Sequence, residues 1–257
     1  MKIGLMYTER CNFQCRHCMV DSKVEKYSIA DGAVIDRFLE IVKYNKPEQV
    51  CIVGGEPLLF IEQMENLIER IRAYCHDILV YSNGSFLLDE TKRKRVSDLG
   101  VQVRISKTDF HKDFWTDEVE QLINDSPYWK IEALDRTIKV FPRGRALTNN
   151  IYQNQSCPCS LVNEIYQGQW HNDRFLIMQD GSVNIWCPCM SLEVANVFTD
   201  DIITHDLLME REGKLRDFLK EMDMFYDDML FMCNEVCNQF KVTNKGIYRD
   251  DELMEEF

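Results

Sequence analysis

Apolar residues in the first half of the chain alternate between two patterns. Short apolar or alternating runs predict β-strands, and longer segments with apolar residues three or four apart predict α-helices. The predicted strands are residues 2–8, 49–53, 77–81, 101–106, 129–134 and 136–141. Strands that alternate with helices form parallel sheets, and the last two strands are too close in sequence for a full helix between them. The pattern therefore predicts an α/β fold built on a partial (β/α)6 barrel of the TIM type, with open ends.

The predicted helices carry recognisable start and stop residues. Ser28, with Asp31 three residues later, resembles a capping box at the start of the first helix. Asp89 predicts the start of the third helix, which ends at Gly100, and residues 115–123 predict the fourth. The second helix has a buried stripe of Ile61, Met64, Leu67, Ile68 and Ile71. In such barrels the carboxyl ends of the strands hold the functional groups.

The pattern changes after residue 148. Residues 149–155 are polar and turn-like, which is typical of a linker. Two apolar runs on either side of Asp180 and Gly181 predict a β-hairpin, and residues 207–222 predict a helix. We therefore expect two domains, residues 1–148 and residues 149–257, the second being a small hairpin and helix unit.

Composition and charge narrow the class of protein. The chain has 257 residues, of which 45% are apolar, and a formal net charge of −13. Nucleic-acid binding needs clustered cations, and the dense basic run is confined to residues 92–95, so we expect no nucleic-acid partner. Without an apolar run long enough for a membrane span, or a hydrophobic segment of the signal-peptide kind, we expect a cytoplasmic protein and no membrane partner. The acidic segments 221–228 and 250–257 suit a cationic substrate, whereas oligomeric state leaves no mark in the sequence.

Eleven cysteines in a chain without a secretion signal indicate metal binding in a reducing compartment. Three of them, Cys11, Cys15 and Cys18, follow the first strand at Cys-x3-Cys-x2-Cys spacing. Because four thiolates are the usual complement of a [4Fe–4S] cluster, three can hold such a cluster and leave one iron open. A zinc site would want a fourth ligand nearby in paired Cys-x-x-Cys form, and buried structural cysteines have no reason to keep this spacing.

A second motif, Gly54-Gly55-Glu56-Pro57, closes the second predicted strand. Together with the cysteine motif it resembles the radical S-adenosylmethionine (SAM) enzymes. The resemblance implies that a [4Fe–4S] cluster on Cys11, Cys15 and Cys18 chelates SAM and cleaves it reductively to a 5′-deoxyadenosyl radical. That radical would abstract hydrogen from a substrate C–H bond, with electrons from an external donor of the flavodoxin or ferredoxin type.

The same resemblance implies which residues contact SAM. The Gly-Gly-Glu-Pro segment would hold the SAM ammonium through its backbone, since the two glycines allow close approach and Glu56 offers a carbonyl. His17 occupies the place where an aromatic ring stacks on the adenine. The other expected contacts lie at the ends of later strands: Ser82, Asn83, Ser106, Asp109 and Arg143.

The second region holds six further cysteines, in three pairs: Cys157 and Cys159, Cys187 and Cys189, Cys233 and Cys237. A hairpin that brings cysteines to a cluster, followed by a helix and two late cysteines, is similar to the twitch and SPASM extensions of radical SAM enzymes. Six thiols suffice for one auxiliary [4Fe–4S] cluster and not for two fully ligated ones. The preferred ligands are Cys159, Cys187, Cys233 and Cys237, with Cys157 and Cys189 as alternates. The chain departs from the twitch pattern at Trp186, which stands where that pattern has its hairpin cysteine.

The extensions imply two classes of substrate. We expect modification of a ribosomally made peptide (RiPP), by crosslinking or epimerisation, because open barrel ends and an acidic surface suit an extended peptide. Dehydrogenation or epimerisation of a small sugar or cyclitol is the alternative. A hypothesis from another class is a non-catalytic iron–sulfur electron carrier, and SAM-dependent formation of 5′-deoxyadenosine separates it from an enzyme. Cys51, in the second strand, either packs in the core or returns a hydrogen atom to a substrate radical.

Overall fold

The computed structural model describes residues 1–18, 20–25, 29–108, 114–133, 174–185, 193–221, 240–243 and 246–249. The first part of the chain alternates strand and helix, as the apolar pattern predicts. Its elements are β1 (Lys2–Thr8), α1 (Gly32–Asn45), β2 (Gln49–Gly54), the 3-10 helix η1 (Pro57–Phe60), α2 (Ile61–Arg72), β3 (Ile78–Ser82), the 3-10 helix η2 (Ser85–Leu88), α3 (Glu90–Asp98), β4 (Gln102–Lys107), α4 (Asp117–Asn124) and β5 (Trp129–Ala133). The later elements are β6 (Arg174–Ile177), β7 (Ser182–Ile185), β8 (Glu193–Asn196), α7 (His205–Glu221), β9 (Phe240–Thr243) and β10 (Gly246–Arg249).

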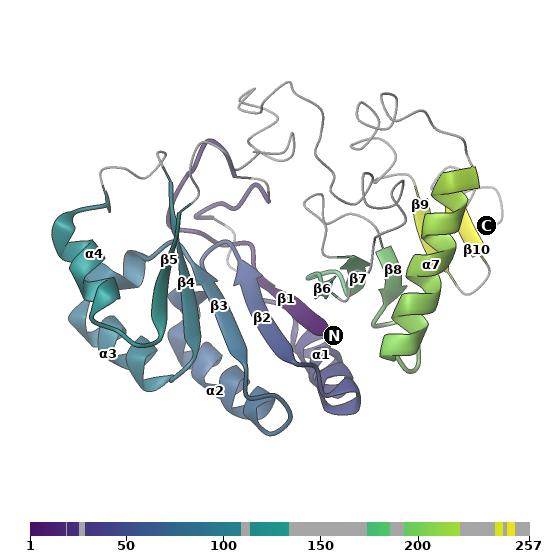
Figure 1. Cartoon of the computed structure of the whole chain (residues 1–257), viewed down its shortest axis with the longest axis horizontal. Helices are drawn as coiled ribbons and strands as arrows, with labels where there is room; N and C mark the ends of the chain where they lie inside the picture. Colours follow the sequence, from purple (N-terminus) through teal and green to yellow (C-terminus); the bar gives the residue numbers. More distant parts are fainter. Residues whose placement is uncertain are drawn as a thin grey trace.

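The described strands form one ten-stranded sheet in the order β10-β9-β8-β7-β6-β1-β2-β3-β4-β5. The six strands from β6 through β1 to β5 run parallel to one another. Helices α1, α2 and α3 lie along one face of these strands and do not cover the other face (Figure 1). This is the predicted α/β fold, a partial barrel with a β-hairpin and a helix beyond it.

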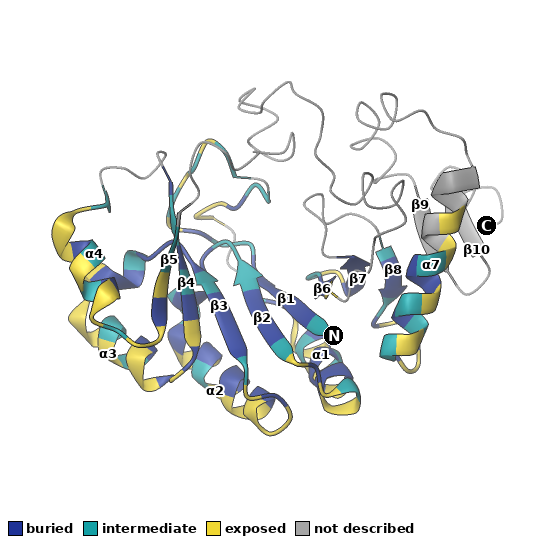
Figure 2. Cartoon of the chain, in the orientation of Figure 1, coloured by how far each residue is buried: buried dark blue, intermediate teal, exposed yellow. Residues whose placement is uncertain are grey.

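Alternation along each strand decides which side chains enter the core. In β1, Ile3, Leu5 and Tyr7 are buried against the helices, and the residues between them face the opposite side of the sheet. The predicted stripe of α2 is confirmed, since all five of its apolar residues are buried. Figure 2 shows the result: buried strands, and helices whose outer sides are exposed. The core therefore lies between the sheet and the helices, and the opposite face of the sheet is free to serve a site.

Two helix starts differ from the predictions because a later residue caps the first turn. The side chain of Asp31 accepts a hydrogen bond from the Ala33 N–H at 2.8 Å, so Asp31 caps α1, whereas Ser28 lies outside the described residues. Helix α4 begins at Asp117, because the Thr116 hydroxyl accepts from a backbone N–H of its first turn. The prediction for α3 is confirmed, with Asp89 as its N-cap.

The hairpin predicted around Asp180 and Gly181 is confirmed as the antiparallel pair β6–β7. Gly181 has a φ of +85°, a conformation that side chains with a Cβ rarely adopt. Strand β6 also pairs in parallel with β1, so the hairpin extends the barrel's sheet at the β1 edge. The predicted strand 136–141 and linker 149–155 lie outside the described residues, and the boundary between residues 148 and 149 stays a prediction.

Helix α7 is fixed to the turn after β8 by a buried ion pair. The Arg211 guanidinium donates to both carboxylate oxygens of Asp200, at 2.6 and 2.9 Å, and to the Val194 carbonyl at 3.0 Å. From the other side, Arg37 of α1 donates to the Asp200 carbonyl at 2.7 Å and the Val197 carbonyl at 2.9 Å. The turn after β8 is thereby tied both to α7 and to the barrel. Within the described part of the chain, no helix combines the length and apolarity needed to cross a membrane.

Candidate functional site

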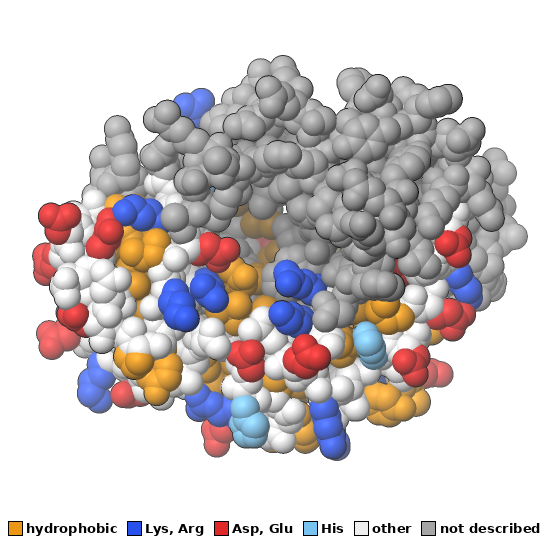
Figure 3. Space-filling model, in the orientation of Figure 1, with side chains coloured by type: hydrophobic (Ala, Val, Ile, Leu, Met, Phe, Trp, Pro, Cys, Tyr) orange, Lys and Arg blue, Asp and Glu red, His pale blue; other side chains and the backbone are white. Residues whose placement is uncertain are grey.

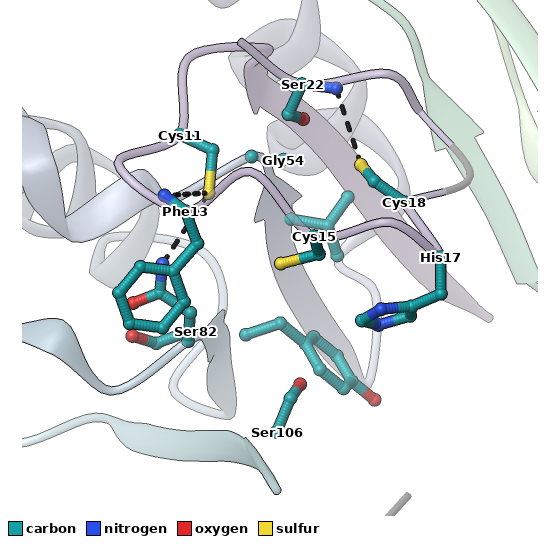
Figure 4. A pocket seen from close by; sticks show the side chains of 13 residues that line it. Cys11, Phe13, Cys15, His17, Cys18, Ser22, Gly54, Ser82 and Ser106 are labelled. Atoms are coloured by element: carbon teal, nitrogen blue, oxygen red, sulfur yellow. Dashed lines mark hydrogen bonds between the residues drawn. The ribbon is translucent and has the colours of Figure 1, made fainter. Parts of the chain in front are cut away.

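The three motif cysteines lie in the loop after β1 and share one cavity (Figure 4). All three are free thiols; Cys11 is buried, and Cys15 and Cys18 are half-buried. The cavity has a volume of about 360 Å³, within the range of small-molecule sites. It lies at the carboxyl ends of β1 to β4, and its walls include Phe13, His17, Ser22, Val53, Gly54, Gly55, Tyr81, Ser82, Asn83 and Ser106.

The two glycines of the Gly-Gly-Glu-Pro motif press the end of β2 against the cysteine loop. The Gly55 N–H donates to the Thr8 carbonyl at 2.7 Å, and the Glu56 N–H donates to the Arg10 carbonyl at 2.8 Å. A Cβ on Gly54 would lie 2.3 Å from the Thr8 oxygen, and one on Gly55 would lie 2.2 Å from the Arg10 oxygen. Only glycine permits this approach, so the motif supports the loop that carries the cysteines as well as lining the cavity.

Hydrogen-bond donors are directed at the sulfurs of Cys11 and Cys18. Cys11 Sγ accepts from the Phe13 N–H at 3.4 Å and from Asn83 Nδ2 at 3.5 Å, and Cys18 Sγ accepts from the Ser22 N–H at 3.4 Å (Figure 4). Burial raises the pKa of the Cys11 thiol, and these donors lower it in part. Donors of this kind stabilise a sulfur that carries negative charge, as a metal-bound thiolate does.

The donor set fits a cluster better than a single ion. Among the described residues, no three Cys, His, Asp or Glu side chains are placed to hold one metal ion. Tetrahedral zinc needs its ligands around one point, at about 2.3 Å for sulfur. In a cubane each thiolate binds its own iron, so three thiols that line one cavity would hold three irons of a [4Fe–4S] cluster and leave the fourth open.

The Glu56 carboxylate lies behind the cavity wall and joins the ends of β2 and β3. It accepts from the Asn83 N–H at 2.6 Å, from Ser82 Oγ at 2.9 Å and from the Leu58 N–H at 3.0 Å. Burial is the largest effect on this group and raises its pKa to about 7, although the three donors act in the opposite direction. Its backbone carbonyl accepts from the Leu59 N–H at 3.2 Å. The position of Asn83, and with it a donor to Cys11, therefore depends on this carboxylate.

The structure brings most of the predicted SAM contacts to this cavity. His17, Gly54, Gly55, Ser82, Asn83 and Ser106 line it, whereas Glu56 and Pro57 are buried behind the lining. Their roles toward SAM stay predictions. The predicted contacts Asp109 and Arg143 lie outside the described residues, as do Cys157, Cys159, Cys187, Cys189, Cys233 and Cys237.

Four residues of the lining carried no prediction: Phe13, Ser22, Val53 and Tyr81. Val53 and Tyr81 lie near the ends of β2 and β3, on the face of the sheet that lines the cavity. The alternation of side chains along each strand could therefore have identified them. Phe13 and Ser22 belong to the cysteine loop, where no periodic pattern indicates which side chains point inward.

The sequence model of the radical SAM superfamily matches residues 5–152, which include the cysteine motif and the Gly-Gly-Glu-Pro motif. The chain belongs to the radical SAM superfamily. It is therefore an enzyme of a family that works with a [4Fe–4S] cluster and SAM, and the electron-carrier hypothesis is set aside.

Curated relatives of this radical SAM protein match over little more than a third of its length. The GTP 3′,8-cyclase of Sulfurovum sp. is 33% identical over 99 residues, which is 37% of this chain and 30% of that protein. The GTP 3′,8-cyclase of Aquifex aeolicus is 33% identical over 103 residues, which is 38% of this chain and 32% of that protein. The match thus spans about a third of the length of these relatives.

Two solved structures share the fold over most of the chain. BtrN in complex with AdoMet and 2-DOIA has a TM-score of 0.55 at 18% identity, covering 86% of this chain and 87% of BtrN. anSMEcpe with bound AdoMet and Cp18Cys peptide has a TM-score of 0.52 at 16% identity, covering 81% of this chain and 79% of anSMEcpe. At these identities the likeness shows the fold.

Proposed function

We propose that Cys11, Cys15 and Cys18 hold a [4Fe–4S] cluster at which SAM is cleaved, and that the enzyme removes hydrogen from an unactivated substrate C–H bond. The observation that carries this proposal is the single cavity, which brings three free thiols together with Gly54 and Gly55 at the ends of four parallel strands. When bound, the cluster supplies the electron for reductive cleavage of SAM, and an external flavodoxin or ferredoxin replaces that electron.

The chain's own residues bind and orient. The Phe13 N–H and the Asn83 amide hold the sulfur of Cys11, and the backbone at Glu56 is the proposed acceptor for the SAM ammonium. The ring of His17, which reaches into the cavity in Figure 4, is the proposed partner of the adenine. Ser82, Asn83 and Ser106 are the remaining proposed contacts on the described wall, with Asp109 and Arg143 proposed from the sequence.

For residues 149–257 we propose a twitch-like unit with one auxiliary [4Fe–4S] cluster on Cys159, Cys187, Cys233 and Cys237. The hairpin β6–β7 and the helix α7, which the apolar pattern of the sequence predicts, support the proposal. The free thiols of Cys51 and Cys75 are compatible with a reducing, cytoplasmic location.

As substrate we propose a ribosomally made peptide, modified by crosslinking or epimerisation. The support is the cavity at the carboxyl ends of β1 to β4, together with the fold shared with anSMEcpe, a protein solved with a bound peptide. The second candidate is oxidation or epimerisation of a small sugar or cyclitol. It is supported by the fold shared with BtrN, which was solved with the small molecule 2-DOIA.

The experiment is anaerobic reconstitution with iron and sulfide, followed by iron counting and an assay for 5′-deoxyadenosine. Loss of SAM cleavage in the triple variant Cys11/Cys15/Cys18→Ala, with iron falling from about eight to about four per chain, supports one cluster at each place. If iron instead falls from about four to none in the triple variant, the unsubstituted protein holds only the cluster on Cys11, Cys15 and Cys18, and the proposal of an auxiliary cluster is wrong. A matched double variant, Cys51/Cys75→Ala, replaces two buried free cysteines elsewhere and should keep both iron and SAM cleavage. Equal activity in the triple variant and the unsubstituted protein would refute the proposal.

A further inference from the structure

The side of the sheet that faces the cavity carries a row of cations just below it. Strand register pairs Tyr81 of β3 with Arg104 of β4, and Arg104 with Lys130 of β5. Paired residues of neighbouring strands share a face, and residues one step along the strand point to the other. Tyr81 lines the cavity, and so does Ser106, two positions beyond Arg104 on the same strand. Arg104 and Lys130 therefore lie on the cavity side of the sheet.

A second pair of cations lies on the same face near β1. Lys2 of β1 is in register with Arg174 of β6. Their neighbours in sequence, Ile3 and Phe175, are buried in the core against the helices, so Lys2 and Arg174 belong to the opposite face.

Electrostatic contacts show that these groups converge. The positive charges of Arg104 and Arg174 both lower the pKa of Tyr81, against the larger raising effects of burial and of Glu132. Arg174 and Lys2 act in the same direction on Cys51. The ring of Tyr81 therefore lies within the fields of two guanidinium groups that come from strands on opposite sides of it.

Cations gather on this face although the chain as a whole is acidic. The net charge of the chain is −13, yet Figure 3 shows Lys and Arg side chains gathered over the strands below the hollow. Neither Arg104 nor Lys130 forms an ion pair with a residue that the structure describes. Two carboxylates lie near these strands. Glu132 is in register with Ser106, and Asp77, just before β3, accepts hydrogen bonds from the side chains of Gln49 and Gln102. Two cations on one face of an acidic protein, Arg104 and Lys130, that form no ion pair with a described residue indicate an anionic ligand.

We propose that this face is the anion-binding part of the substrate site, where Arg104, with Arg174 across Tyr81, receives a carboxylate or phosphate group carried by the substrate. The inference rests on the proposed function, because it places the substrate beside the cavity assigned to SAM. A guanidinium binds such groups with two parallel hydrogen bonds, and Lys130 adds charge at longer range. In a peptide the group would be an acidic side chain or a terminal carboxylate, and in a small molecule a phosphate or a carboxylate. The acidic segments of the sequence had suggested a cationic substrate, and this face points to the reverse.

The test is calorimetric titration of the reconstituted full chain with two probes, inorganic phosphate and succinate. SAM is present and reductant is absent, so that the site for the SAM carboxylate is filled and no turnover occurs. We expect saturable binding that weakens as salt is added, and that weakens about tenfold in Arg104→Gln, the loss of one charge-assisted pair. Arg104→Lys keeps the charge without the planar fork and should fall between the two. The matched control is Arg70→Gln, on the helix side of the sheet, where Arg70 pairs with Asp36.

Tighter binding of phosphate indicates a phosphorylated substrate, and tighter binding of succinate a carboxylate; either outcome supports the anion site. Absence of saturable binding by either probe, or equal weakening in Arg70→Gln and Arg104→Gln, would overturn it. Iron content and circular dichroism establish that each variant is folded, and Lys130→Gln provides a second variant at an exposed position. SAM cleavage by the unsubstituted protein tests the proposed function separately, so a protein that cleaves SAM and fails this titration refutes the anion site alone.

Discussion

Replacing Glu56 by Gln should remove a large part of the pH dependence of stability. The carboxylate is buried, and its pKa in the folded protein rises from 4.5 to about 7. Because the folded state then holds a proton that the unfolded state releases at lower pH, the contribution of Glu56 to stability is complete below about pH 4.5 and is lost as pH rises through about 7. A difference of about 2.5 pH units, at about 1.4 kcal/mol each, corresponds to about 3 kcal/mol. About 2 kcal/mol of this loss falls between about pH 5.5 and about pH 8, a range above the sequence pI of 4.9.

The assay is urea unfolding of the cluster-free full chain at several pH values in that range. The quantity compared is the difference in the free energy of unfolding between the unsubstituted protein and Glu56→Gln, since other titrating groups are common to both. That difference should change by about 2 kcal/mol across the range, with the unsubstituted protein losing stability toward high pH. Glu69→Gln, an exposed position on α2, is the control and should leave the pH profile unchanged. Parallel pH profiles for the unsubstituted protein and Glu56→Gln would refute the reasoning.

Three further predictions concern the site and its supports. Gly55→Ala places a methyl group against the Arg10 carbonyl, so we expect a loss of about 2–3 kcal/mol in thermal or urea unfolding together with reduced iron uptake, and an unchanged melting curve would contradict it. Asn83→Leu removes a hydrogen-bond donor to the Cys11 sulfur, so the reduction potential of the reconstituted cluster should fall by about 40 mV, the equivalent of about 1 kcal/mol. The potential is followed by electron paramagnetic resonance, and an unchanged potential would mean that the sulfur does not use this donor. Arg211→Ala leaves a buried carboxylate without its cation and should cost about 3–5 kcal/mol in urea unfolding, whereas a loss below about 1 kcal/mol would show that the carboxylate reaches water.

The fold followed from patterns that are local in sequence. The stripe of α2 and the hairpin around Asp180 and Gly181 were predicted because spacing and turn chemistry within a few residues decide them. The parallel pairing of β6 with β1 was not predicted, since an apolar run does not indicate which strand it will adjoin. The exact start of α1 was less predictable, because the sequence offers two polar residues, Ser28 and Asp31, as possible N-caps, and the structure has Asp31 in that role.

The residues of the site could be predicted where they belong to a sequence motif. They could not be predicted where the pairing of strands brings distant residues together. The three cysteines and the two glycines were identified from their spacing. The burial of the Glu56 carboxylate depends on β3 lying next to β2, which the motif alone does not reveal. The acidic segments 221–228 and 250–257 suggested a cationic substrate. Arg104 and Lys130 are brought together by the pairing of β4 with β5, which no local pattern in the sequence reveals.

The position of β1 in the sheet has a consequence for the order in which the protein is assembled. Leu5 pairs with Ile52 on one side and with Ile177 on the other. Synthesis proceeds from the N-terminus, so a growing chain that has not reached Ile177 keeps one edge of β1 unpaired, and its cysteine loop extends from an incomplete strand. Contacts between residues so distant in sequence also form slowly. The strand that carries the cysteine loop is therefore completed only once the hairpin has been made. A truncation that ends before the hairpin would hold the same three cysteines on a strand that lacks its second neighbour.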